Sequence, residues 1–231
     1  LVAEVGDQII VAPDNGVLSF LLGKSPKARC FELTDPALGC TRPAAYAVRA
    51  GLLRAVGADP ADERPVATLP DHEALDAMRG EYRRVLLRLA ARDLAHHVGV
   101  DDAAAELSDL AAGTLEAGLA VARQRVGEDA HLVRLAVVAM GKCGGHELNY
   151  VSDVDVVFVA EPGGELTQAA TKLASRVMRI AGEACFEVDA NLRPEGRQGA
   201  LVRTLEGHVA YYKNKGGCEK HTPKTVVELV Q

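Results

Sequence analysis

The sequence predicts an α/β (α+β) protein in which a helical region precedes a mixed unit of strands and helices. Two observations predict it. Between residues 34 and 131 the chain is rich in alanine, and its apolar residues recur at helical spacing. From Leu132 onward the pattern changes to β-branched runs, at Leu132–Met140 and Val154–Val159, which are then followed by alternating helix and strand signals.

Composition narrows the class of protein. The 231 residues are 48% hydrophobic and 25% charged, which is enough apolar material for a core and excludes a wholly disordered chain. No run of about 18 uncharged apolar residues predicts a membrane span, and the start Leu-Val-Ala-Glu lacks the basic residues of a secretory signal. A net charge of −6 argues against non-specific nucleic-acid binding. Five cysteines without a CxxC pair favour a reducing, cytoplasmic setting.

The first segment, residues 1–33, differs in pattern from the helical region after it. Gln8–Val11 is a short strand signal, Pro13–Gly16 is typical of a turn, and Val17–Leu22 is a second apolar run. A β-hairpin and a strand–turn–helix both fit. Neither this segment nor the tail from Lys213 has a long apolar stripe, so we expect both ends to pack loosely.

Three helices are expected in residues 34–131, each burying one apolar stripe. The first covers Ala44–Val56 behind Pro43. The second begins at Asp71 as its cap and runs to about Val98, with Gly99 as its C-terminal cap. The third begins at Asp101 or Asp102 and ends near Gly127.

Residues 132–212 form the mixed unit. After the two strands we expect a helix over Leu166–Ala184 and a strand over Phe186–Leu192, where apolar and polar residues alternate. A last helix opens at Thr204 or Glu206 and runs through Tyr212.

Three carboxylates in this unit point to metal chemistry. Asp153 and Asp155 are two residues apart at the start of a strand, so their side chains leave on the same face. Two carboxylates so close repel each other unless a cation lies between them, and Mg²⁺ is the natural candidate. Asp189 on the later strand would complete a metal site for phosphoryl transfer. The alternative is ordinary: an Asp-x-Asp at a strand start often only caps a turn or adds surface charge.

Glycines before this pair favour the functional interpretation. Gly144 and Gly145 precede His146-Glu147-Leu148, which we interpret as a short helix with a glycine-rich N-terminus. Free backbone N–H groups at such a position bind phosphate. Arg193 and Arg197, just beyond Asp189, are further candidate phosphate ligands, with surface ion pairing as the alternative.

Other motifs fail. The segment Gly141–Gly145 has neither the GxxxxGK[ST] order of a P-loop nor GxGxxG spacing, and His146-Glu147 lacks the second histidine of a zinc protease. Cys143 has no partnered histidine in the sequence that would indicate a nucleophile.

One long motif, which begins at Gly141 and includes Asp153 and Asp155, is specific enough to indicate a family. Gly141-Lys142, Gly144–Tyr150 and Ser152–Asp155, continued by Asp189–Arg203 and Tyr211-Tyr212, resemble the signature of the glutamine synthetase adenylyltransferase/adenylyl-removing enzymes. The resemblance covers about 33–212. The sequence Glu147–Tyr150 is more similar to the N-terminal, adenylyl-removing half of that family than to the half that attaches AMP.

The resemblance implies a nucleotidyltransferase core of the DNA-polymerase-β type over residues 132–212, preceded by the helical region. It implies removal of AMP from a tyrosine of glutamine synthetase by phosphorolysis, or its addition. Asp153, Asp155 and Asp189 would bind Mg²⁺, and Gly144, Gly145, Ser152, Arg193 and Arg197 would contact nucleotide or phosphate. The implied partners are glutamine synthetase, ATP or ADP, inorganic phosphate and the PII signal protein, with no nucleic acid and no membrane.

The two ends depart from the family pattern. Gly6–Leu18 weakly resembles a short piece of the S-adenosylmethionine hydroxide adenosyltransferases, and residues 213–231 match nothing expected. These departures suggest a truncated or chimeric chain. The alternative function is therefore a catalytically incomplete fragment that binds nucleotide or a partner without turnover.

Overall fold

The computed structural model of the chain describes residues 9–11, 43–161 and 167–214. The turn and second apolar run expected at 13–22, and the tail beyond 214, lie outside the described residues. No helix in the described part of the chain combines the length and apolar character needed to cross a membrane.

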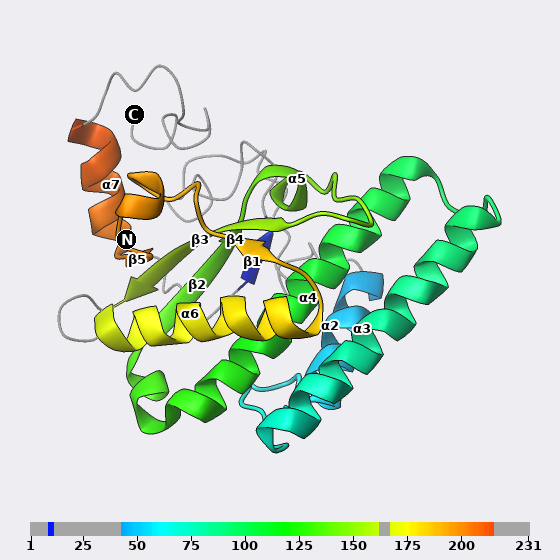
Figure 1. Cartoon of the computed structure of the whole chain (residues 1–231), viewed down its shortest axis with the longest axis horizontal. Helices are drawn as coiled ribbons and strands as arrows, with labels where there is room; N and C mark the ends of the chain where they lie inside the picture. Colours follow the sequence, from blue (N-terminus) through cyan, green and yellow to red (C-terminus); the bar gives the residue numbers. More distant parts are fainter. Residues whose placement is uncertain (1–8, 12–42, 162–166, 215–231) are drawn as a thin grey trace.

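The helical region forms as the sequence predicts. Helix α2 covers Pro43–Ala55, α3 covers Asp71–Leu94 and α4 covers Val100–Val126. Figure 1 shows α3 at one side of the molecule, antiparallel to the long helix α4, with α2 beside them. Leu75, Met78 and Leu89 are buried or half-buried on α3, as the predicted stripe requires.

Helix α4 is the centre of the molecule. It packs against α2, α3 and α6, so almost every side chain from Leu107 to Arg123 is buried. The expectation of a single apolar stripe is wrong for this helix. Small residues let its neighbours approach on every side: at Gly113, an added Cβ would lie 3.2 Å from the Cα of Arg49 on α2.

A mixed sheet lies beside these helices, in the order β1-β2-β3-β4 with β5 also paired to β3. Strand β2 (Arg134–Ala139) is antiparallel to β3 (Val154–Glu161), whose other edge carries β4 (Val188–Asp189) and β5 (Val202–Arg203), both parallel to it. Strand β1 (Ile9–Val11) pairs in parallel with Val137–Ala139 of β2. At these three residues the first segment is part of the sheet, so the loose packing expected there is wrong.

One face of the sheet packs against helices, and the other face carries Asp155. Helix α6 (Thr167–Ala184) packs on α4 and on the sheet strands β2 to β5, and Figure 1 shows it lying across the sheet. Along β3 the even-numbered residues, such as Val156 and Phe158, are buried. The odd-numbered ones, including Asp155, are half-buried and leave from the opposite face.

Four local predictions need correction. Helix α3 ends at Leu94, where His96 takes the left-handed φ of 57°, and Gly99 is the N-cap of α4 instead of a C-terminal cap. The strand expected over Phe186–Leu192 is only Val188–Asp189, because Asp189 bonds its own chain two residues later. Strand β5 was not expected. It is too short to show a period, and helix α7 (Leu205–Asn214) follows it.

Candidate functional site

The structure brings the three predicted carboxylates together. Asp155 and Asp189 are register partners on the neighbouring parallel strands β3 and β4, so their side chains share a face. Asp153 precedes β3 by one residue and joins them. One carboxylate oxygen from each of the three lies within 4.8 Å of the others.

The cluster is crowded with negative charge. Partial burial raises the pKa of Asp155, and the charges of Asp153 and Asp189 raise it further, while Lys142 lowers it. Like charges at this separation disfavour ionisation of the carboxylates. A cation bound here would relieve this repulsion, and the donor set consists of hard carboxylate oxygens.

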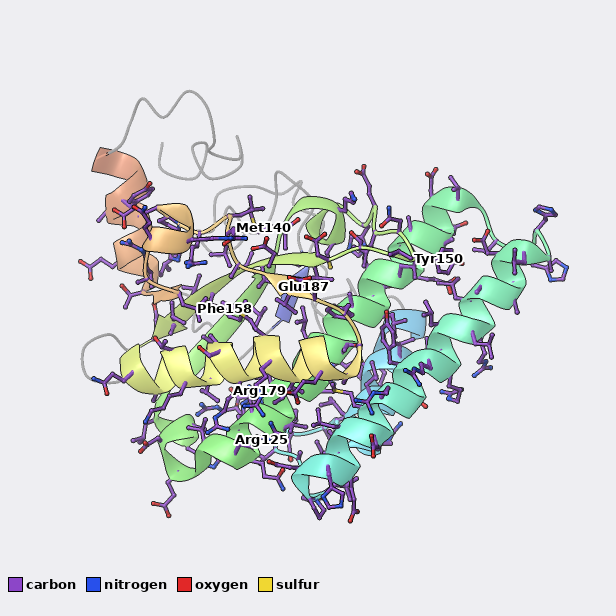
Figure 2. The ribbon with its side chains drawn as sticks, viewed as in Figure 1. Arg125, Met140, Tyr150, Phe158, Arg179 and Glu187 are labelled. Atoms are coloured by element: carbon purple, nitrogen blue, oxygen red, sulfur yellow. The ribbon has the colours of Figure 1, made fainter. Side chains whose placement is uncertain are left out.

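Gly141 lets the chain pass close to this cluster. Its φ is +52°, a conformation that side chains rarely adopt, and an added Cβ would lie 2.6 Å from Oδ2 of Asp155. The backbone N–H of Met140 donates to the carbonyl of Asp155 at 2.8 Å. Figure 2 shows Met140 and Glu187, which precedes β4, at the same end of the sheet. The turn after β2 is thus fixed directly against the carboxylates.

The glycine-rich turn is not built as the sequence predicts. The short helix α5 covers Gly141–Gly144, so Gly144 and Gly145 lie at its end instead of preceding a helix at 146–148. The N–H groups of Gly144 and Gly145 donate to the carbonyls of Met140 and Gly141, at 3.0 and 2.9 Å. These bonds close the turn, so the two amides are already used. The interpretation of a helix with free N–H groups at 144–145 is wrong, and any role in binding phosphate stays a prediction.

Asn191 is a site residue that the sequence reasoning missed. Its backbone N–H donates to Oδ1 of Asp189, and its side-chain amide donates to Oδ2, both at 2.7 Å. Its own Oδ1 accepts from Nε of Arg197 at 3.1 Å. The Asp-x-Asn spacing, at which a side chain bonds a neighbouring backbone group, was the available signal.

The two arginines beyond β4 differ in their surroundings. Arg193 donates to three backbone carbonyls, those of Ala190, Arg197 and Gly199, and so holds its own loop together. Arg197 is exposed and uses Nε on Asn191. The structure therefore links Arg197 to the carboxylate cluster through Asn191, whereas three of the five N–H donors of Arg193 serve the loop. Ser152 is half-buried directly before Asp153.

Cys143 has no features of a reactive thiol. Burial raises its pKa to about 12, and the negative charges of Asp109 and Asp155 add to the effect. A thiol with so high a pKa is protonated at neutral pH. This agrees with the sequence interpretation, which found no partnered histidine.

Comparisons with known proteins identify relatives. A family model described as glutamate-ammonia ligase adenylyltransferase matches residues 55–219. The chain is 57% identical over 153 residues to the bifunctional glutamine synthetase adenylyltransferase/adenylyl-removing enzyme of Streptomyces avermitilis, a match that covers 61% of this chain and 15% of the relative. The protein of the same name from Streptomyces coelicolor is 55% identical over 156 residues, covering 61% and 16%. That from Corynebacterium diphtheriae is 48% identical over 160 residues, covering 64% and 15%. The matched part spans about 15% of the length of these relatives.

Proposed function

Because the chain belongs to the glutamate-ammonia ligase adenylyltransferase family, we propose that its carboxylate cluster is the metal-binding centre of a polymerase-β-type nucleotidyltransferase core acting on glutamine synthetase. The observation that supports this most directly is the meeting of Asp153, Asp155 and Asp189 within 4.8 Å. The family match covers this cluster, and relatives carry the corresponding activities in their names.

The donor set fits Mg²⁺. Three carboxylates on two adjacent strands offer hard oxygen ligands, and their mutual repulsion disfavours the ionised, empty arrangement. A bound Mg²⁺ would neutralise negative charge on the phosphoryl oxygens. Asp153 and Asp155 would hold it, and Asp189, oriented by Asn191, would complete the site and orient the nucleophile.

We propose removal of AMP as the direction. An oxygen of inorganic phosphate forms a bond to the phosphorus of the tyrosine-linked AMP. The bond between that phosphorus and the tyrosine oxygen breaks, and the oxygen takes up a proton. The products are ADP and free tyrosine. The resemblance of Glu147–Tyr150 to the adenylyl-removing half supports this direction. Positioning and charge neutralisation supply most of the catalysis in such transfers.

The test uses the whole chain, adenylylated glutamine synthetase, inorganic phosphate and Mg²⁺. We expect ADP release that stops with EDTA or in Asp155→Asn and persists in Asp102→Asn, an exposed aspartate at the start of α4. Incorporation of labelled AMP from ATP instead would overturn the direction. Metal-dependent binding of nucleotide without release would identify the chain as a binding segment, and no metal dependence of either would overturn the site.

A further inference from the structure

Exposed apolar side chains flank the carboxylate cluster on two loops. In the described part of the chain, Val151 is the most exposed of the large apolar residues, at 94%, and it lies two residues before Asp153. Tyr150 beside it and Leu192, three residues after Asp189, are each 38% exposed. Because Asp153 and Asp189 meet in the cluster, both loops lie on the surface next to it. We call Tyr150, Val151 and Leu192 the apolar border.

The loop that carries Val151 is held in place on both sides. Single exposed apolar residues are common on protein surfaces, so exposure alone indicates no function. Here, however, Leu148 and Val154 at the two ends of the loop are buried in the core. The hydroxyl of Tyr150 donates to Asp93 of α3 at 2.9 Å, and Figure 2 shows Tyr150 beside the helices α3 and α4. The loop therefore presents Val151 to solvent in a fixed place.

The loop that carries Leu192 is fixed as well. Asn191 donates two hydrogen bonds to Asp189, and Arg193 donates to the carbonyl of Ala190 at 2.7 Å. These bonds come from the residues on either side of Leu192, so its side chain keeps its place next to the cluster. A surface that is ordered before its partner arrives loses less conformational entropy on binding.

We infer that the apolar border is the surface on which the glutamine synthetase polypeptide around the modified tyrosine docks. The inference rests on the proposed function, in which the AMP to be removed is attached to a protein side chain. Because a tyrosine side chain is short, the backbone that carries it and the residues beside it must contact the surface around the cluster.

The chemistry of the apolar border fits a polypeptide. Phosphate binds through charge and hydrogen bonds, so it gains nothing from exposed apolar side chains such as Val151 and Leu192. Apolar side chains with polar neighbours, and tyrosine in particular, are typical of protein interfaces. The partner is therefore expected to carry apolar side chains beside its modified tyrosine.

The experiment compares two substrates that contain the same reacting bond. One is adenylylated glutamine synthetase, and the other is N-acetyltyrosinamide with AMP on its hydroxyl, which has no surrounding protein. The whole chain is assayed with Mg²⁺ and inorganic phosphate as the wild type, Val151→Ser and Leu192→Ser. The matched control is Leu132→Ser. Leu132 is 58% exposed and lies next to the end of β2 that pairs with Glu161, at the opposite end of β3 from Asp155.

The ratio of kcat/KM for the protein substrate to kcat/KM for the small substrate removes effects that are common to both. We expect each border variant to lower this ratio by about tenfold, mainly through a higher KM for the protein, because truncating an important interface side chain commonly weakens binding by this factor. Leu132→Ser should leave the ratio unchanged. An unchanged ratio in both Val151→Ser and Leu192→Ser would overturn the inference.

Direct binding separates this inference from the proposed function. If the wild type does not cleave both substrates, binding to immobilised adenylylated glutamine synthetase is measured instead by biolayer interferometry. Cleavage of neither substrate overturns the proposed reaction but not the docking surface. A Kd that is raised about tenfold in both border variants and unchanged in Leu132→Ser would support the docking surface without turnover. Absence of binding by the wild type, or equal binding by all four proteins, would overturn it.

Discussion

At the scale of single residues, burial and the crowding of the three carboxylates disfavour the ionised form of Asp155. Asp155 titrates above its usual pKa in the folded chain, chiefly because of burial and then because of Asp153 and Asp189. For a carboxyl with a raised folded pKa, the ionised form destabilises the fold. The metal-free protein should therefore lose stability as pH rises from the unfolded-state pKa through the higher folded-state value.

Replacing Asp155 tests whether its ionised carboxylate destabilises the fold. We expect Asp155→Asn to be as stable as the wild type, or slightly more so, at pH 7 without metal, and to lack the loss between acidic and neutral pH. Thermal melting of both proteins at several pH values, with EDTA, measures it. Added Mg²⁺ should raise the Tm of the wild type only. A lower Tm for the variant at pH 7 without metal would show that the carboxylate stabilises the fold.

Asn191 is expected to act through Asp189. Asn191→Ala removes the bond from the side-chain amide to Oδ2 of Asp189 and leaves the one from the backbone N–H. Loss of such an orienting partner typically weakens metal binding by about 10- to 100-fold. Titration with Mn²⁺ followed by electron paramagnetic resonance measures the Kd. Gln198→Ala, an exposed position in the same loop, is the control. Equal Mn²⁺ affinity in Asn191→Ala and the wild type would remove Asn191 from the site.

At the scale of elements, a buried ion pair joins α2 to α4. Arg49 donates from Nε and Nη2 to the two carboxylate oxygens of Glu116 at 2.7 and 2.6 Å, and both side chains are 2% exposed. Breaking a buried pair from one side leaves an uncompensated charge. Arg49→Met should lower the free energy of unfolding by about 3–5 kcal/mol.

The double variant Arg49→Met/Glu116→Leu should recover most of that loss, because no buried charge remains. Urea denaturation measures both, with Arg54→Met, an exposed arginine on the same helix, as control. Equal stability of the single and double variants would show that the cost is one of packing and not of charge.

Two helical glycines make a matched test of close packing. Gly113 on α4 is buried, and an added Cβ would meet Arg49 and Leu52 of α2 at 3.2 Å. Gly80 on α3 is exposed, and nothing lies within 4 Å of an added Cβ. Gly113→Ala should destabilise by about 1–3 kcal/mol. Gly80→Ala should stabilise by about 0.5–1 kcal/mol. Similar effects at both positions would contradict close contact of α2 and α4.

The sequence indicated the elements with strong periodicity and the residues of the cluster. Helices α2 and α6 begin and end close to the expected residues, and Asp153, Asp155 and Asp189 meet as predicted. Short elements set by other parts of the chain were not predictable. Strand β5 exists because Val202 pairs with Phe158, and α4 is buried all round because three helices surround it. Asn191 contacts Asp189 through local hydrogen bonds, which a periodic pattern of apolar residues cannot predict.

At the scale of the whole molecule, the sheet joins segments that the sequence analysis had separated. Ile9–Val11 lie within the segment expected to be foreign, yet they pair with the same β2 residues that pair with β3 on the other side. Strand β2 is therefore an inner strand of the sheet. Without β1, its backbone N–H and C=O groups on one edge would lose their partners.

Deleting residues 1–33 tests whether this pairing stabilises the molecule. We expect faster amide exchange in peptides from β2 (Arg134–Ala139), because the amides that face β1 become accessible to water. Helix α3 does not hydrogen-bond with β1. Its amides should therefore keep their protection and serve as the internal control. The new edge should also promote association, seen as a larger species in light scattering. Unchanged exchange in β2 after the deletion would mean that β1 adds no stability, and that the rest of the described fold is independent of the first segment.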